Sequence, residues 1–238
     1  MRVSHPDAEA LERVLGILHE RYHNEIWHWD AEHIRGPMDI VAGAVLVQHT
    51  TWTNAERALE QLRAAGALEP SLLAQMTDDA LVPLVRISGT PTIKARRLRA
   101  VAATIEQSGG IDALLALPKD VLRTKLLDTH GIGPETADAI LLYAAGHRAF
   151  LIDAYTQRLF CRIGIGPDGA SYDAWQRWFE DRLPDATARD FQRHHAHIVL
   201  HGKTLCRPKP RCDACPLLSQ CAFRKSKLTA PVATAERS

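Results

Sequence analysis

Four cysteine thiols in one short run are the residues of this sequence best suited to bind a metal. Cys206, Cys212, Cys215 and Cys221 lie within the segment CRPKPRCDACPLLSQC. Thiolates at such spacing can converge on one centre, where they hold either an iron–sulfur cluster or a zinc ion. A disulfide framework is disfavoured, because disulfides suit secreted chains and the first residues lack the apolar core of a signal peptide.

The spacing of these cysteines favours a cluster over zinc. Zinc sites usually draw on two CxxC pairs, or on one pair and distant His or Cys ligands. Here only Cys212 and Cys215 form a CxxC pair, and longer steps flank it on both sides. The pattern therefore predicts a 4Fe–4S cluster, with zinc as the alternative. The fifth cysteine, Cys161, lies in an apolar stretch and is predicted to be a small buried side chain.

A glycine-rich turn in residues 127–142, LDTHGIGPETADAILL, is suited to bind an anion. Gly131 fits a left-handed helix C-cap, and Pro134 fits the first turn of the next helix. The amides at the start of that helix would lack partners within the helix and could receive a phosphate oxygen. Gly133 would let the ligand approach the backbone closely, and Ile132 would insert between the two helices.

Asp153, in the segment FLIDAYTQRLF, follows an apolar run and precedes a helical pattern. Aspartate is a favoured N-cap, so a capping role is the simpler interpretation. The alternative is a carboxylate held at the mouth of a cleft beside the glycine turn. There it could stabilise a sugar cation or activate water.

Helices must position these groups, and helical periodicity runs through nearly the whole chain. Apolar spacing predicts helices over residues 8–22, 38–47, 54–65, 71–75, 77–85, 93–107, 119–129, 134–145 and 154–163. Thr77, followed by two aspartates, is predicted to be an N-cap. Strand signals are scarce, and the sequence from Ala222 onward is predicted to be poorly ordered.

Composition sets further limits on the class of protein. The chain has 238 residues, 46% of them hydrophobic, which is enough for one large domain or two small ones. No run of 18 apolar residues occurs, so we expect no membrane span and a cytoplasmic location. The net charge is +1, yet residues 201–238 hold eight Lys and Arg against two acids. The basic run from Lys203 to Arg211 could face phosphate, whereas the residues from Lys225 onward suit a solvated tail.

Three segments resemble the helix–hairpin–helix DNA glycosylases of the endonuclease III superfamily. The hairpin and the aspartate carry this resemblance in LLDTHGIGPETADAILLYAAGHRAFLIDAYTQRLF. The tail HGKTLCRPKPRCDACPLLSQC is similar to the family's cluster loop, and VAGAVLVQHTTWTNAERALEQL is similar to its early barrel helix and DNA-wedging loop. The resemblance implies an all-α, two-lobed protein. A six-helix barrel with the hairpin would span residues 25–146, the cluster lobe 1–24 and 147–222, and a flexible basic tail 223–238.

The resemblance also implies what the residues do. The partner would be double-stranded DNA with a damaged base, bound by a monomer, and the base would swing out of the stack before chemistry. Gln48 would fill the vacated space, and Asp153 would be the catalytic carboxylate. The other DNA contacts would come from Gly131, Ile132, Gly133, Lys209 and Arg211, and the cofactor would be a 4Fe–4S cluster.

Several positions depart from the usual pattern. Family members that also cut the DNA backbone carry a lysine two residues after the second glycine, and its amine forms a Schiff base. This chain has Glu135 there, and a carboxylate cannot form an imine. Ala154 and Tyr155 follow the aspartate where the lyase-type enzymes usually have Thr and His. The first cysteine spacing is one residue shorter than the commonest form. These departures predict a glycosylase without lyase activity.

The same departures resemble the 3-methyladenine DNA glycosylase branch of the superfamily. That branch shares the pattern seen here as Gln48, Thr50 and Trp52. Alkylated purines are positively charged, so an aromatic pocket would favour them through stacking and cation–π attraction. The candidates for that pocket are Trp52, Trp27, Trp29 and Tyr155, and core packing is the alternative role for each tryptophan.

Three other functions stay open from the sequence. The first is a bifunctional glycosylase and abasic-site lyase acting on oxidised pyrimidines, with another lysine as the amine. The second is a DNA-lesion-binding protein that kept the fold and lost the chemistry, which Glu135 would permit. The third is an electron carrier built on the cluster, which would have no need of a hairpin or a wedge.

Overall fold

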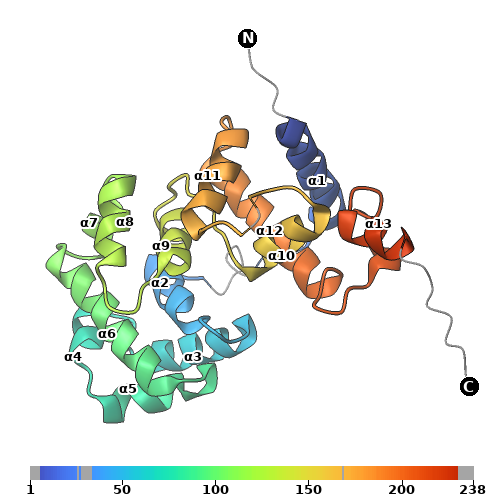
Figure 1. Ribbon diagram of the computed structural model, residues 1–238. Coiled ribbons are helices and arrows are strands. Elements are labelled where there is room, and N and C mark those ends of the chain that lie inside the picture. The colour runs from blue at the N-terminus through green and yellow to red at the C-terminus, as the bar shows by residue number, and fades with distance from the viewer. Residues whose placement is uncertain (1–5, 26, 28–33, 168, 230–238) are drawn as a thin grey trace, which may run out of the picture. The chain divides into compact units, whose positions relative to one another are not determined.

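The computed structural model describes residues 6–25, 27, 34–167 and 169–229, and every regular element among them is a helix (Figure 1). The predicted all-α class is therefore confirmed. The α-helices are α1 (Pro6–Tyr22), α2 (Pro37–Leu46), α3 (Trp52–Ala64), α4 (Pro70–Gln75), α5 (Asp78–Val85), α6 (Pro91–Gln107), α7 (Ile111–Leu115), α8 (Lys119–Leu127), α9 (Pro134–Ala139), α10 (Ala154–Ile163), α11 (Tyr172–Arg182), α12 (Ala188–Thr204) and α13 (Ala222–Thr229). Two short 3-10 turns, η1 (Arg86–Ser88) and η3 (Cys212–Ala214), and a π-helical turn, η2 (Ile140–Ala144), complete the set.

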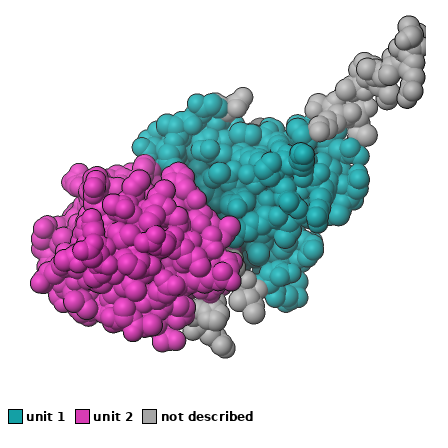
Figure 2. Space-filling model, turned by 90° about the horizontal axis from the view of Figure 1, so that it is seen from below, with its two compact units in different colours: residues 1–25, 152–186, 193–238 teal, residues 26–151, 187–192 magenta. Residues whose placement is uncertain are grey.

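The chain divides into two compact units, coloured separately in Figure 2. Unit 1 comprises Met1–Glu25, Ile152–Ala186 and Arg193–Ser238. Unit 2 comprises Ile26–Leu151 and Thr187–Gln192. Unit 2 is therefore almost one continuous segment, whereas unit 1 is assembled from both ends of the chain.

Helix α2 forms the centre of unit 2. Its residues from Asp39 to Leu46 are all buried, because α3, α6, α9 and η2 pack around it. A helix that is apolar on all sides is stable only when it is enclosed in this way. The buried Asp39 is paired with Arg63 of α3 at 3.1 Å. This enclosure fixes the position of the loop that follows α2, which contains Gln48.

Unit 1 is built around aromatic packing. Phe179 of α11 meets Phe160 of α10 and Trp178 edge-to-face, each with ring centroids 4.9 Å apart. At the start of the chain, the Tyr22 hydroxyl lies 3.1 Å from His201 Nδ1 and 3.2 Å from Thr204 Oγ1. These contacts join α1 to the end of α12.

Proline or a polar cap stands at the start of many helices, and Pro134 of α9 was predicted in this role. Proline occupies the first turn of α2, α4, α6 and α9. Thr77 is the N-cap residue of α5 as predicted, although its side chain makes no capping hydrogen bond. In the described residues no helix is long and apolar enough to cross a membrane.

Two sequence predictions were wrong. The stretch from Ala222 was expected to lack order, but Ala222–Thr229 forms α13, and Phe223 packs beneath the Arg162 guanidinium at 5.0 Å. Residues 230–238 of the predicted tail lie outside the described residues. Cys161 was expected to be buried, but it is exposed. The buried face of α10 repeats at helical spacing through Thr156, Leu159, Phe160 and Ile163, and position 161 falls outside it.

Candidate functional site

The glycine turn forms a hairpin between α8 and α9. Gly131 has a φ of 80°, the left-handed conformation that was predicted, although α8 already ends at its C-cap Asp128. Gly133 is the N-cap residue of α9, and no side chain caps that helix. Ile132 is buried between these glycines, with 5% of its surface exposed. The backbone amides in the first turn of α9 therefore have no side-chain acceptor within the hairpin.

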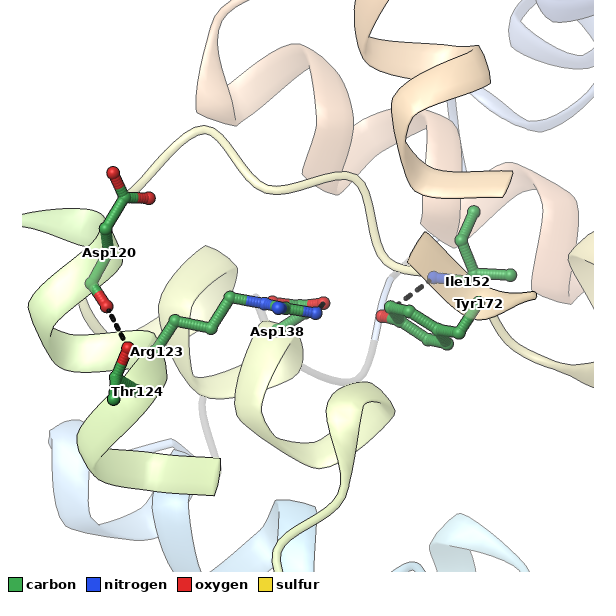
Figure 3. Close-up of polar contacts among 6 residues, drawn as sticks. All are labelled: Asp120, Arg123, Thr124, Asp138, Ile152 and Tyr172. Carbon is green, nitrogen blue, oxygen red and sulfur yellow. Dashed lines mark hydrogen bonds and ion pairs between the residues drawn. The ribbon is translucent and has the colours of Figure 1, made fainter. Parts of the chain in front are cut away.

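A buried ion pair holds the two hairpin helices together (Figure 3). Arg123 of α8 donates from Nε to Asp138 Oδ1 at 2.8 Å and from Nη2 to Oδ2 at 3.2 Å. The Asp138 side chain is fully buried. A bidentate guanidinium pair of this kind fixes both distance and orientation. It sets α9 at a defined angle against α8.

Gln48 lies in the loop after α2 and its amide contacts the hairpin directly. Its Nε2 donates to Thr136 Oγ1 at 2.8 Å and to the Gly131 carbonyl at 3.4 Å. Its Oε1 accepts a short hydrogen bond from Arg97 Nη1 of α6. The next residue, His49, has a φ of 55°, which turns the loop sharply. The structure thus places Gln48, which was predicted to fill the vacated stack, against the glycine hairpin, which was predicted to bind phosphate, and Arg97 contacts Gln48 as well.

Lys94 of α6 binds the backbone directly before the same loop. Its ammonium donates to the Leu46 carbonyl, at the end of α2, at 2.6 Å, and also to the Ser88 carbonyl. Burial and, to a smaller extent, the nearby Arg97 charge together lower the pKa of Lys94 to about 8. Neither Lys94 nor Arg97 was identified from the sequence, because basic residues on an amphipathic helix usually face solvent.

Asp153 caps α10 as predicted, and it also has a second partner. Its Oδ1 accepts from the Thr156 amide at 2.7 Å, and its Oδ2 lies 3.5 Å from His195 Nε2 of α12. Burial alone would raise the pKa of Asp153, but the hydrogen bond and charge of His195, with the Thr156 amide, outweigh burial and lower it. The carboxylate is therefore held ionised, with 11% of its side chain exposed.

Two residues bear on whether the protein has an amine that could act as a nucleophile. Glu135 is exposed in the first turn of α9. Lys203, near the end of α12, is exposed at the surface, yet desolvation lowers its pKa while the Asp153 charge acts in the opposite direction. His195 thus acts electrostatically on Asp153, and Asp153 acts on Lys203. The sequence run RHHAHIVLHGK contains both residues, and its helical spacing was the signal that could have identified His195.

The four clustered cysteines line one small apolar pocket in unit 1, with Leu159, Ile163, Leu205 and Leu217 among its walls. Arginines of α10 hold the loop in place. Arg158 donates to the carbonyls of Cys206 and Gly202 at 2.9 Å and 3.2 Å. Arg162 donates to the carbonyls of Arg207 and Pro208 at 2.6 Å and 3.0 Å. The loop is therefore fixed through its backbone.

The chemistry of this pocket fits a thiolate-bound group. Arg162 Nη1 lies 3.4 Å from Cys206 Sγ, and His201 Nε2 lies 3.5 Å from Cys215 Sγ. Burial and the neighbouring cysteines raise the pKa of the Cys215 thiol, so its thiolate form needs a positive centre beside it. The His, Cys, Asp and Glu side chains of the described residues are not gathered around one metal-ion position, so the fit rests on the four cysteines that line the pocket and on its charge balance rather than on coordination geometry.

The predicted aromatic residues are found in both units. Trp52, at the start of α3, and Trp27 are buried in unit 2, with 7% and 6% of their surfaces exposed. Trp29 lies outside the described residues. Tyr155 belongs to unit 1, where the Arg158 guanidinium lies 5.0 Å from its ring centroid. A side chain at Gly202 would overlap the Tyr155 ring.

The predicted basic contacts lie on the cysteine loop. The side chains of Lys209 and Arg211 are exposed. The Arg211 amide donates to the Leu205 carbonyl at 3.0 Å, which folds the loop back on itself. Both charges are thus presented to solvent on a backbone that the α10 arginines immobilise.

Comparison with known proteins gives consistent matches. Residues 42–185 match the profile of the HhH-GPD superfamily of base excision DNA repair proteins. The chain is 38% identical over 216 residues to a Methanocaldococcus jannaschii protein named as a DNA repair glycosylase, covering 90% of this chain and 96% of that one.

Solved structures of similar shape are also known. One is the H. pylori 3-methyladenine DNA glycosylase bound to 1,N6-ethenoadenine, with a TM-score of 0.69, 25% identity, and coverage of 83% of this chain and 97% of that one. A second is an endonuclease III–DNA complex, with a TM-score of 0.77, 20% identity, and coverage of 93% and 98%. The second likeness concerns the fold alone.

Proposed function

Because the chain belongs to the HhH-GPD superfamily of base excision DNA repair proteins, we propose that it is a monofunctional DNA glycosylase. It acts as a monomer in the cytoplasm on double-stranded DNA, swings out a damaged base and hydrolyses the N-glycosidic bond. The observation that carries this proposal is Asp153, a nearly buried carboxylate whose pKa is lowered by His195 and Thr156.

Asp153 performs the chemistry through its charge. Loss of the base leaves positive charge on the sugar, and a pre-placed anion stabilises that charge without reorganisation. The Thr156 amide holds one carboxylate oxygen, and the other faces His195. That second oxygen orients the attacking water. Gln48 fills the space that the base leaves, and the hairpin amides grip the backbone phosphate.

Lyase activity is absent in this proposal because Glu135 occupies the position of the nucleophilic amine. One observation favours a second candidate, a bifunctional enzyme. Lys203 has a lowered pKa and interacts with the charge of Asp153, so it is the amine to test. A Schiff base on Lys203 would be trapped by borohydride in the wild type and lost in Lys203→Met.

Alkylated purines are the proposed substrate class. The sequence pattern around Gln48, and the likeness to a 3-methyladenine glycosylase bound to an ethenoadenine, support this choice. Trp52 is the strongest aromatic candidate to stack on a cationic base. Its burial also suits a packing role, so Trp52→Phe and Trp52→Leu distinguish stacking from size: only the leucine variant should lose excision if stacking matters.

A 4Fe–4S cluster held by Cys206, Cys212, Cys215 and Cys221 is the proposed cofactor. The shared apolar pocket and the Arg162 and His201 contacts to sulfur support it. When bound, the cluster supplies a structural link that fixes the loop carrying Lys209 and Arg211. Purified protein should contain four irons and four acid-labile sulfides per chain. One zinc per chain would contradict this assignment.

The decisive experiment is a panel of duplexes that each carry one lesion, scored before and after alkali. The proposal predicts base loss on alkylated purines, with strands cut only after alkali, and no adduct trapped by borohydride. Strand cleavage without alkali would indicate a bifunctional enzyme. Tight binding of a lesion duplex without base loss would indicate a non-catalytic lesion-binding protein.

A further inference from the structure

We propose that Arg97 is a positioning residue that holds Gln48 against the hairpin in the free protein and must release it before Gln48 can enter DNA. Arg97, Gln48 and Thr136 then form a latch. This inference rests on the proposed role of Gln48 as the residue that fills the vacated stack.

The amide of Gln48 is fully engaged before any DNA is bound. Its oxygen accepts from the Arg97 guanidinium, and its nitrogen donates to Thr136 Oγ1 at 2.8 Å and to the Gly131 carbonyl at 3.4 Å. A side chain inserted into a DNA stack cannot keep these contacts. Insertion therefore requires that all three are broken, and the most strongly polarised is the charge-assisted one from Arg97.

Packing holds Arg97 in the latched position. A Cβ at Gly131 would lie 2.6 Å from Arg97 Nε and 2.8 Å from Arg97 Cδ, so the arginine side chain lies directly against the glycine. The helix that carries Arg97 is itself fixed one turn earlier, where buried Lys94 bonds the Leu46 carbonyl at the end of α2. Helix α6 thus contacts both the residue at the end of α2 and Gln48 itself.

The latch lowers the population of protein that is ready to insert Gln48. A protein whose competent state is only fractionally populated binds its ligand more weakly by that fraction. The cost applies only where Gln48 inserts, that is, to a duplex with a vacated position. Binding to an intact duplex leaves the latch closed and is unaffected by it.

The test is a ratio of two dissociation constants measured on otherwise identical duplexes. One duplex is intact, and the other carries a tetrahydrofuran abasic-site analogue opposite a normal base. The ratio of intact to abasic Kd reports insertion, because any general change in charge alters both constants equally. Arg97→Met should raise this ratio several-fold, up to about tenfold for loss of one charge-assisted hydrogen bond.

Two further variants make the test specific. Thr136→Val removes the second Gln48 partner without changing charge and with little change in shape, and it should raise the ratio as well. Arg96→Met is the matched control, because Arg96 is the adjacent, exposed arginine on α6. It should weaken both duplexes alike or leave both unchanged.

A double variant decides the outcome. In a Gln48→Ala background there is nothing to latch, so Arg97→Met should no longer change the ratio. An unchanged ratio in both Arg97→Met and Thr136→Val would overturn the latch, as would an equal change with and without Gln48. If Gln48→Ala alone leaves the ratio of intact to abasic Kd at its wild-type value, the latch is also overturned.

The latch and the proposed glycosylase fail in different ways. The ratio needs no catalysis, since neither duplex carries an excisable base at the test position. Loss of excision on every lesion with the ratio pattern intact would refute the glycosylase and keep the latch. Excision with a ratio that no variant moves would refute the latch and keep the glycosylase.

Discussion

The starts of α9 and α10 are both loop-to-helix junctions at proposed functional residues, and they solve the same physical problem in opposite ways. The first turn of any helix leaves backbone amides without partners. At α10 the Asp153 side chain satisfies the Thr156 amide from within the chain. At α9 the N-cap is Gly133, which has no side chain to offer, and the junction has no side-chain cap.

This difference separates two roles for a helix N-terminus. The open junction at α9 can take an anion from outside, so it suits a phosphate. The closed junction at α10 has an anion of its own, which is locked in position and held ionised. In this protein the uncapped end of α9 is the proposed binding position, and the end of α10, capped by an acid with a second polar partner, is the proposed reactive one.

Removing the charge at the closed junction should have the largest effect. Asp153→Asn keeps a good N-cap but removes the anion, so excision should fall by about two to three orders of magnitude. Lesion-duplex binding should survive or tighten slightly. Single-turnover excision and a binding titration measure the two.

A pure cap elsewhere provides the control. Ser171 caps α11 by accepting from the Ala174 amide at 3.3 Å. Ser171→Ala and Asp153→Ala should each cost about 1 kcal/mol of stability for the lost cap. Only Asp153→Ala should abolish excision. Equal excision in the two variants would reduce Asp153 to a structural cap.

The open junction should be sensitive at Gly133 without loss of stability. A Cβ at Gly133 meets nothing within 4 Å in the protein, and its φ of −95° suits any residue. Gly133→Ala should therefore fold normally. It should weaken DNA binding by about tenfold, since a methyl group blocks a hydrogen bond to a charged phosphate.

Gly131→Ala is the matched contrast in the same hairpin. Its φ of 80° disfavours alanine, and the new Cβ would overlap Arg97. The expected result is a loss of about 1–3 kcal/mol of stability, visible in thermal unfolding. A stable Gly131→Ala together with an unfolded Gly133→Ala would contradict the description of the hairpin.

The smallest expected effect is a shift in pH dependence at the closed junction. His195 lowers the pKa of Asp153 against burial, which raises it. In His195→Gln the burial effect is less opposed, so the pKa of Asp153 should rise. Excision needs the ionised carboxylate, and activity should then be lost at a higher pH on acidification than in the wild type. An acid limb that does not move would show that His195 does not act through Asp153.

Sequence patterns predicted the local features of the site better than the contacts between residues that are distant in sequence. Asp153 as an N-cap and Gly131 as a left-handed turn follow from residue type and neighbours alone, and both are present. The starts of α5, α9 and α10 were predictable for the same reason, because Thr77, Pro134 and Asp153 act within one turn, whereas α7, α11 and α12 were not predicted. Such features depend on contacts close in sequence.

The partners that determine the electrostatics could not be predicted this way. Arg97 reaches Gln48 across 49 positions, and Arg158 reaches the cysteine loop across 48. No periodicity reports such contacts. The helix at Ala222–Thr229 was missed for a related reason: its sequence is polar, and Phe223 packs against Arg162, which lies on another helix.

The way unit 1 is assembled from both chain ends has a consequence for biosynthesis. Unit 2 is nearly complete once residue 151 has left the ribosome, but α1 has to wait for its partners. Tyr22 meets His201 across 179 positions, and at about 5–20 residues per second that delay is on the order of ten seconds. During that time α1 lacks its native partners α11 and α12, and its side chains Leu11, Leu15 and Leu18, which are buried in the native fold, stay uncovered. We therefore expect a nascent-chain chaperone to bind this protein at α1.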